Sequence, residues 1–162
     1  MGLEISFWAL AAVGVIAALA VVSVRNVFHA ALSLIMCFLA VSGIFITLSA
    51  DFLAAVQVLV YVGAISVLII IGVMLTREVQ RGSPSNKLRF PAFIVAILFL
   101  GVVVFAVTST QWPISSISPL EPTTAALGLK LFGKDGFILP LEIAPVLLLA
   151  AILGAIVIIR EK

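Results

Sequence analysis

Long, uninterrupted apolar runs constrain this chain more than any other feature of its sequence. The runs cover residues 5–24, 27–50, 52–75, 90–107 and 141–159. Each is close to the roughly 20 residues that a helix needs to cross the hydrocarbon core of a bilayer. Helices satisfy their own backbone hydrogen bonds, as lipid requires. The sequence therefore predicts an all-α integral membrane protein with five transmembrane helices, forming one membrane domain over residues 1–162.

Composition agrees with this prediction and excludes other classes of protein. Apolar residues make up 64% of the chain and charged residues 10%, whereas a soluble domain has about half and about a quarter. The chain has nine Lys and Arg residues and seven Asp and Glu residues. This excess of positive charge is too small for a phosphate-binding surface. A soluble enzyme, a nucleic-acid-binding protein and a disordered segment are excluded. The lipid bilayer is the first expected partner.

The basic residues predict how the chain is oriented in the membrane. With five spans, only Lys130 and Lys134 lie on one side, in the long connection 108–140. The other side carries Arg25, Arg77, Arg81, Lys87, Arg89, Arg160 and Lys162. Basic loops stay inside, so we expect a cytoplasmic C-terminus and an external N-terminus. The external connection contains a short helical pattern over residues 123–131 and a turn over residues 133–136.

The chain offers few groups that could bind a cofactor. Its single cysteine, Cys37, forms no internal disulfide, and His29 is its only histidine. Iron–sulfur clusters need several thiolates, and a haem held by two histidines needs a second one. We therefore expect no metal site, no bound cofactor and no catalytic residue within this chain.

The third run carries the most informative polar residues. In an α-helix Gln57 and Tyr61 share a face, and Ala64 lies one turn further on. Gly63, in the middle of the run, weakens the helix. The opposite face is expected to hold Ala55, Leu59, Val62 and Ser66. Two interpretations stay open: a water-lined path beside a flexible point, or a tyrosine bonded to a neighbouring helix beside a glycine used for close packing.

Glu142 is the acid at the rim of the fifth run. A helix N-terminus favours an anion, and Pro145 suits a first turn. These two residues predict that Glu142 is a first-turn carboxylate. Small residues four apart predict close helix contacts, and they occur at Gly14 and Ala18, Ala150 and Gly154, and Ala151 and Ala155.

Two segments resemble a known family, NADH-quinone oxidoreductase subunit J of the respiratory complex I membrane arm, the counterpart of mitochondrial subunit 6. The first covers residues 25–75 and includes VRNVFHAALSLI and FLAAVQVLVYVGAISVLIIIGVML. The second covers residues 126–156 and reads ALGLKLFGKDGFILPLEIAPVLLLAAILGAI. The QVLVYVGAI string is the specific part of this resemblance.

The resemblance implies a subunit of a proton-translocating NADH:quinone oxidoreductase with a π-bulge around residues 61–64. One inserted residue corresponds to about 100° of helix rotation. Switching between α and π would turn one half of the helix, so that Tyr61 faces a water path or Val62 blocks it. The gate candidates are then Gln57, Tyr61, Val62, Gly63 and Ala64, with Glu142 as the acidic candidate.

The resemblance also implies a hetero-oligomer in a bacterial inner membrane. Expected partners are subunits A, H and K and the antiporter-like subunits, which would supply the titrating carboxylates. The complex would use iron–sulfur clusters, quinone and, with NADH, FMN. Two alternatives remain from the residues alone: a small stand-alone transporter or channel, and a scaffold that only holds its neighbours in place.

Overall fold

The computed structural model describes residues 1–76, 88–112, 123–134 and 136–159, and all regular structure in these ranges is helical. Five helices are long and apolar enough to cross a membrane, which confirms the predicted fold class. Four of them are α1 (Gly2–Ser23), α2 (Val27–Thr47), α5 (Arg89–Ser109) and α7 (Ile138–Ile159). The remaining one, here called the third span, joins α3 (Asp51–Val56), the π-helical segment η1 (Gln57–Ile65) and α4 (Ser66–Leu75).

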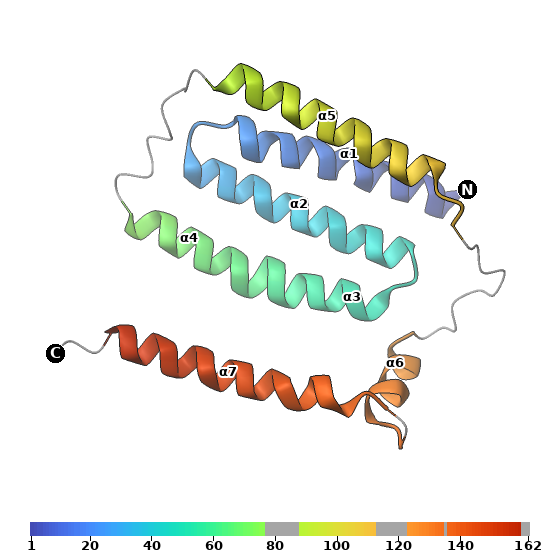
Figure 1. Ribbon diagram of the computed structural model, residues 1–162, viewed down its shortest axis with the longest axis vertical. Coiled ribbons are helices and arrows are strands. Elements are labelled where there is room, and N and C mark those ends of the chain that lie inside the picture. The colour runs from blue at the N-terminus through green and yellow to red at the C-terminus, as the bar shows by residue number, and fades with distance from the viewer. Residues whose placement is uncertain (77–87, 113–122, 135, 160–162) are drawn as a thin grey trace.

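Helix α1 lies along α2, and small residues allow the close approach (Figure 1). A Cβ added to Gly14 would lie 3.5 Å from the Cβ of Ala40. A Cβ added to Gly43 would lie 2.8 Å from Cδ1 of Leu10, which must therefore shift. Small residues let helix backbones approach in lipid. The prediction that Gly14 lies at a close contact between helices is confirmed. The buried neighbour of Gly14 is Ala17 rather than Ala18, which is exposed.

A tight connection turns the chain from α2 into the third span. The second helix ends at Thr47, before the predicted end at residue 50, because Ser49 has a φ of 56°. That left-handed conformation cannot continue a helix. The amide of Ala50 donates to the Phe45 carbonyl at 2.9 Å. The loop is thereby fixed at the end of α2, and the third span starts at once with Asp51.

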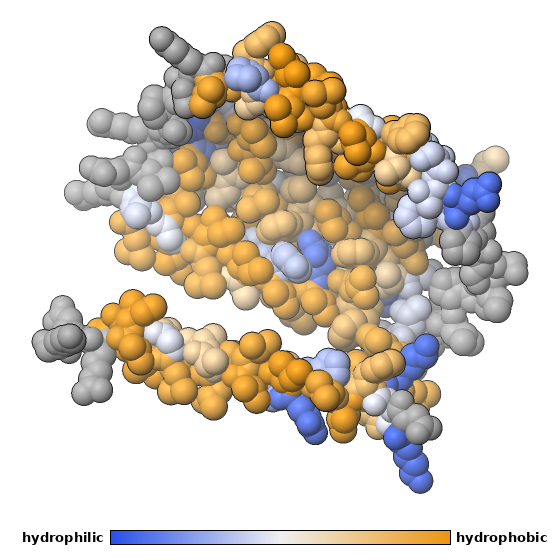
Figure 2. Space-filling model, viewed as in Figure 1, coloured by the Kyte–Doolittle hydropathy of each residue, from blue (hydrophilic) through white to orange (hydrophobic). Residues whose placement is uncertain are grey.

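The last span lies apart from the first three. Helix α7 contacts the short helix α6 (Thr123–Phe132), which in turn contacts α3 (Figure 1). The predicted short helix and the turn after it are confirmed, since the Gly136 amide donates to the Gly133 carbonyl at 2.9 Å. Neither α7 nor the described side chains of α5 include a buried residue. Figure 2 shows their surfaces as mainly hydrophobic.

The last span begins a little earlier than the sequence predicts. Helix α7 begins at Ile138 rather than at residue 141. Its third residue is Pro140, which fits because the first amides of a helix have no partner within it. Glu142 consequently lies in the second turn, and no acidic residue lies in the first. Pro145 lies inside the helix, not in its first turn, and cannot donate to the carbonyl four residues earlier.

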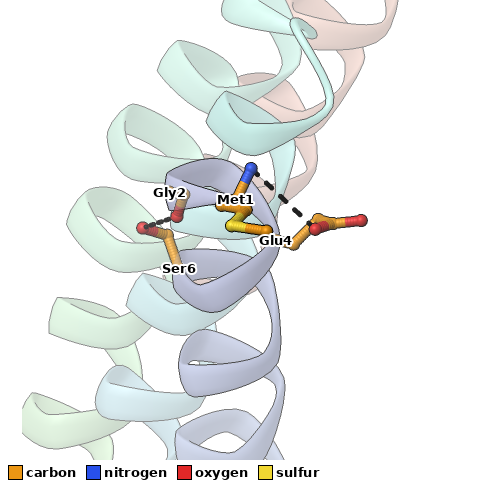
Figure 3. Close-up of polar contacts among 4 residues, drawn as sticks. All are labelled: Met1, Gly2, Glu4 and Ser6. Carbon is orange, nitrogen blue, oxygen red and sulfur yellow. Dashed lines mark hydrogen bonds and ion pairs between the residues drawn. The ribbon is translucent and has the colours of Figure 1, made fainter.

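The first turns of α1 carry two local polar contacts (Figure 3). The Ser6 hydroxyl donates to the Gly2 carbonyl at 3.0 Å. The Met1 ammonium lies 3.9 Å from the Glu4 carboxylate, with both groups exposed. Water screens such a pair, and pairs of this kind contribute little to stability.

Candidate functional site

The middle of the third span is π-helical over nine residues, Gln57–Ile65, with the sequence QVLVYVGAI. At its end the Ser66 amide donates to the carbonyls of Tyr61 and Gly63. An α-helix would direct that amide to the residue four positions back, Val62. The π-bulge expected around residues 61–64 is therefore present, within a longer segment. Such segments are rare and occur often at functional sites.

The π segment changes which residues share a face. In a continuous α-helix Gln57 and Ser66, nine positions apart, would point about 180° apart. One inserted residue reduces that angle to about 80°, within the width of one buried stripe. Gln57 is 8% exposed and Ser66 is 2% exposed, so both are inside. The prediction that Ser66 lies opposite Gln57 was wrong, because it assumed α-helical periodicity throughout.

The Ser66 side chain follows the same π geometry. Its hydroxyl donates to the Tyr61 carbonyl, five residues earlier, at 2.7 Å. Other serines in this chain, such as Ser6 and Ser33, donate to the carbonyl four residues earlier. Tyr61 thus accepts both the amide and the hydroxyl of Ser66 at the end of η1.

Tyr61 is held by its ring and not by its hydroxyl. Its ring packs edge-on against Phe38 of α2, with centroids 5.5 Å apart and planes at 64°. The side chain is 42% exposed. Its hydroxyl makes no hydrogen bond to a described residue. Within this chain, then, the hydroxyl is available to water or to another subunit.

Gln57 is the other polar side chain of this region. It is 8% exposed, its amide makes no hydrogen bond to a described residue, and none of its polar atoms is both fully buried and unpaired. Figure 2 shows a small hydrophilic patch over the middle of α2 and the third span. The amide therefore reaches the surface of this chain, where it is open to water or to another subunit.

The other gate candidates line the same segment. Val62 and Gly63 are partly buried and Ala64 is exposed. A Cβ added to Gly63 would lie 3.4 Å from the Val58 carbonyl oxygen. A side chain there would be in van der Waals contact with the backbone of the π segment itself.

Glu142 is not brought to this segment. It is exposed on α7, which packs mainly on α6 among the described elements (Figure 1). In the described ranges, no group of three or more His, Cys, Asp or Glu residues is close enough to hold a metal ion.

Two contacting residues from α2 escaped the sequence analysis. Phe38 meets Tyr61, and the Ser42 hydroxyl donates to the Ala54 carbonyl of α3 at 3.1 Å. Beside Ser42 an open groove of about 380 Å³ runs between the ends of α2 and the third span. It is lined by Ser42, Ile46, Asp51, Ala54, Ala55 and Val58. No motif marks these positions, since a phenylalanine and a serine in an apolar run have no distinguishing pattern.

Comparison with known proteins points to one family. Residues 17–158 match the model of NADH-ubiquinone/plastoquinone oxidoreductase chain 6. The chain is 42% identical over 154 residues to F(420)H(2) dehydrogenase subunit J of Methanosarcina mazei, covering 93% of this chain and 86% of the relative. It is 43% identical over 165 residues to NAD(P)H-quinone oxidoreductase chain 6 of Synechocystis, covering 97% and 80%. The Leptolyngbya boryana chain 6 is 37% identical over 161 residues, covering 98% and 80%.

Proposed function

Because this chain belongs to the NADH-ubiquinone/plastoquinone oxidoreductase chain 6 family, we propose that its third span is a gate that helps couple quinone reduction to proton transfer. As a family member it is a multi-pass membrane subunit of an oxidoreductase complex, and other subunits of that complex are its partners. The observation that supports the gate is the π segment Gln57–Ile65.

A change of register in this segment would exchange one side chain for its neighbour. Converting π to α removes one inserted residue and turns the two halves by about 100°. Adjacent residues in a helix are also about 100° apart, so a neighbouring valine would take the place of Tyr61: Val60 if the first half of the span stays fixed, and Val62 if the second half does. A tyrosine hydroxyl both donates and accepts hydrogen bonds, and valine does neither. The exchange would therefore make or break a chain of hydrogen-bonded water at this point.

Two features support a path on this side of the helix. The Tyr61 hydroxyl and the Gln57 amide are both polar and have no partner among the described residues. They are four residues apart on one helix, so water in this region would meet both groups. The titrating carboxylates of this path come from neighbouring subunits, since Glu142, the acidic candidate of this chain, lies on α7 away from the segment.

The remaining assignments extend the proposal to the assembly. The neighbours are subunits A, H and K and the antiporter-like subunits, in a bacterial inner membrane with the N-terminus outside and the C-terminus inside. The redox groups, which are iron–sulfur clusters, quinone and FMN, are held by other subunits. The names of the relatives specify F(420)H(2) in one case and NAD(P)H in others, so the electron donor is set outside this chain.

The test of the gate is a matched pair of glycine substitutions in the intact complex. Gly63→Leu places a side chain against the Val58 carbonyl, whereas a Cβ at Gly72 meets nothing within 4 Å. We expect both variants to assemble. Proton pumping, followed by dye quenching in vesicles during quinone reduction, should fall strongly in Gly63→Leu and stay normal in Gly72→Leu. Full pumping by a well-assembled Gly63→Leu complex would refute the gate.

A further inference from the structure

One side-chain hydrogen bond joins two spans in the described part of the chain. The Ser42 hydroxyl of α2 donates to the Ala54 carbonyl of α3 at 3.1 Å. Ser42 is 3% exposed and Ala54 is 5% exposed. Both residues are buried, so little water competes for the bond, and hydroxyl bonds between membrane helices are part of what holds such helices together. This bond therefore fixes α3 against α2 at one defined rotation.

The first half of the third span is held at a second place. The loop before it is fixed to the end of α2 by backbone hydrogen bonds, as described above. The Thr123 hydroxyl, at the start of α6, donates to the Ser49 carbonyl at 3.3 Å, and α6 also contacts α3. A rotation of α3 would have to break the Ser42 bond and disturb this junction together.

The second half has no comparable link. The hydroxyls of Ser66 and Thr76 donate to carbonyls of their own helix, Tyr61 and Gly72. Helix α4 does pack on α2, burying Ser66 and Val73. In the described ranges no hydrogen bond joins α4 to another span. Its rotation is therefore opposed by packing alone.

We propose that Ser42 is a positioning residue that anchors the first half of the third span, so that a change of register in η1 turns the second half. When a helix twists at an internal joint, the half that is held less firmly turns. The functional importance of this anchor rests on the proposed gate. The anchor itself is a statement about α2 and α3 and stands or falls without the gate.

The test measures each half separately in the intact complex. Reporter cysteines replace Leu53 and Met74, which are 49% and 65% exposed near opposite ends of the third span, in a Cys37→Ala background. Labelling by N-ethylmaleimide is followed by mass spectrometry of this chain. Without its hydrogen bond to Ser42, α3 should move away from α2 more often and expose position 53 to the reagent. We therefore expect Ser42→Ala to raise the labelling rate at position 53 about three-fold. The rate at position 74 should not change.

Ser66→Ala is the matched control, because it removes an equally buried hydroxyl that bonds only within its own helix. It should leave labelling at position 53 unchanged. The pair Ser42→Thr and Ser42→Val separates the hydroxyl from side-chain shape and serves if Ser42→Ala does not assemble. Threonine should keep the slow rate and valine should raise it.

The outcomes separate the anchor from the gate. An unchanged rate at position 53 in Ser42→Ala, or equal rates in the Thr and Val variants, would overturn the anchor whatever the pumping assay shows. A raised labelling rate at position 53 in the complex without turnover supports the anchor. If turnover then leaves position 74 unaffected and Gly63→Leu pumps fully, the gate fails while the anchor stands.

Discussion

Deleting one residue from the π segment should leave the third span in a single helical register and keep its packing on α2. A π segment carries one residue more than an α-helix of the same rotation. Leu59 is the most exposed of the large apolar residues of the segment, at 73%, so its removal costs little contact within this chain. After the deletion, Gln57 and Ser66 are eight positions apart and still about 80° apart in a continuous α-helix. Both buried faces therefore keep their places against α2.

A deletion outside the segment provides the contrast. Removing Val67, in the α-helical half, turns everything after it by about 100° and moves it by about 1.5 Å. Val73, 9% exposed against α2, would then leave its packing position. We expect this deletion to impair assembly, because packing is what holds α4 to its neighbour.

The assay combines assembly with pumping. Native gels of solubilised membranes report whether the complex forms, and dye quenching in vesicles reports pumping during quinone reduction. The Leu59 deletion should assemble at near-normal levels and lose most of its pumping, since the inserted residue that permits a change of register is gone. Two results would refute the reasoning: an assembly defect as severe as that of the Val67 deletion, or full pumping by the assembled variant.

Three further experiments test other parts of the structure. Gly43→Leu should destabilise the α1–α2 pair by about 1–3 kcal/mol through overpacking, seen as a lower thermal midpoint of the complex, whereas Gly101→Leu should not, as a Cβ there meets nothing. Tyr61→Phe keeps the ring on Phe38 and loses the hydroxyl, so the complex should assemble and pump less; normal pumping would exclude a role for the hydroxyl. The purified chain in liposomes should carry no proton flux, and a flux abolished by Glu142→Gln would favour a stand-alone transporter.

The five spans were predictable from the sequence because a membrane helix is recognised by its length and hydropathy alone. The short helix before Gly133 was predictable as well, from an apolar pattern between turn residues. The start of α7 was not, because Pro140 was taken as the end of a loop, although the first turn of a helix accepts proline. Pro145 was misplaced for the same reason.

Faces within the spans were harder to predict than the spans. In soluble helices the polar residues mark the outer face, but a helix in lipid is apolar all round and has little such signal. Arithmetic with 3.6 residues per turn then placed Gln57 and Ser66 on opposite faces, whereas η1 buries both. The π segment itself was expected only through the family resemblance.

The contacts that position the site were not predictable at all. Phe38 and Ser42 are single residues in an apolar run, and their roles depend on where the third span returns beside α2. Only the tight loop at Ser49, with its left-handed backbone, brings Ala54 to Ser42. Such a return path is a property of the folded chain and not of a local pattern.

The central claim is that the third span changes register during coupling. The most direct measurement is electron cryomicroscopy of the intact complex in two conditions, inhibited and turning over with quinone, at a resolution that shows backbone carbonyls. The account predicts the π segment Gln57–Ile65 in one population and a continuous α-helix in another, with Ser66 moved off α2. The same π register in every population, in a preparation shown to pump, would contradict it.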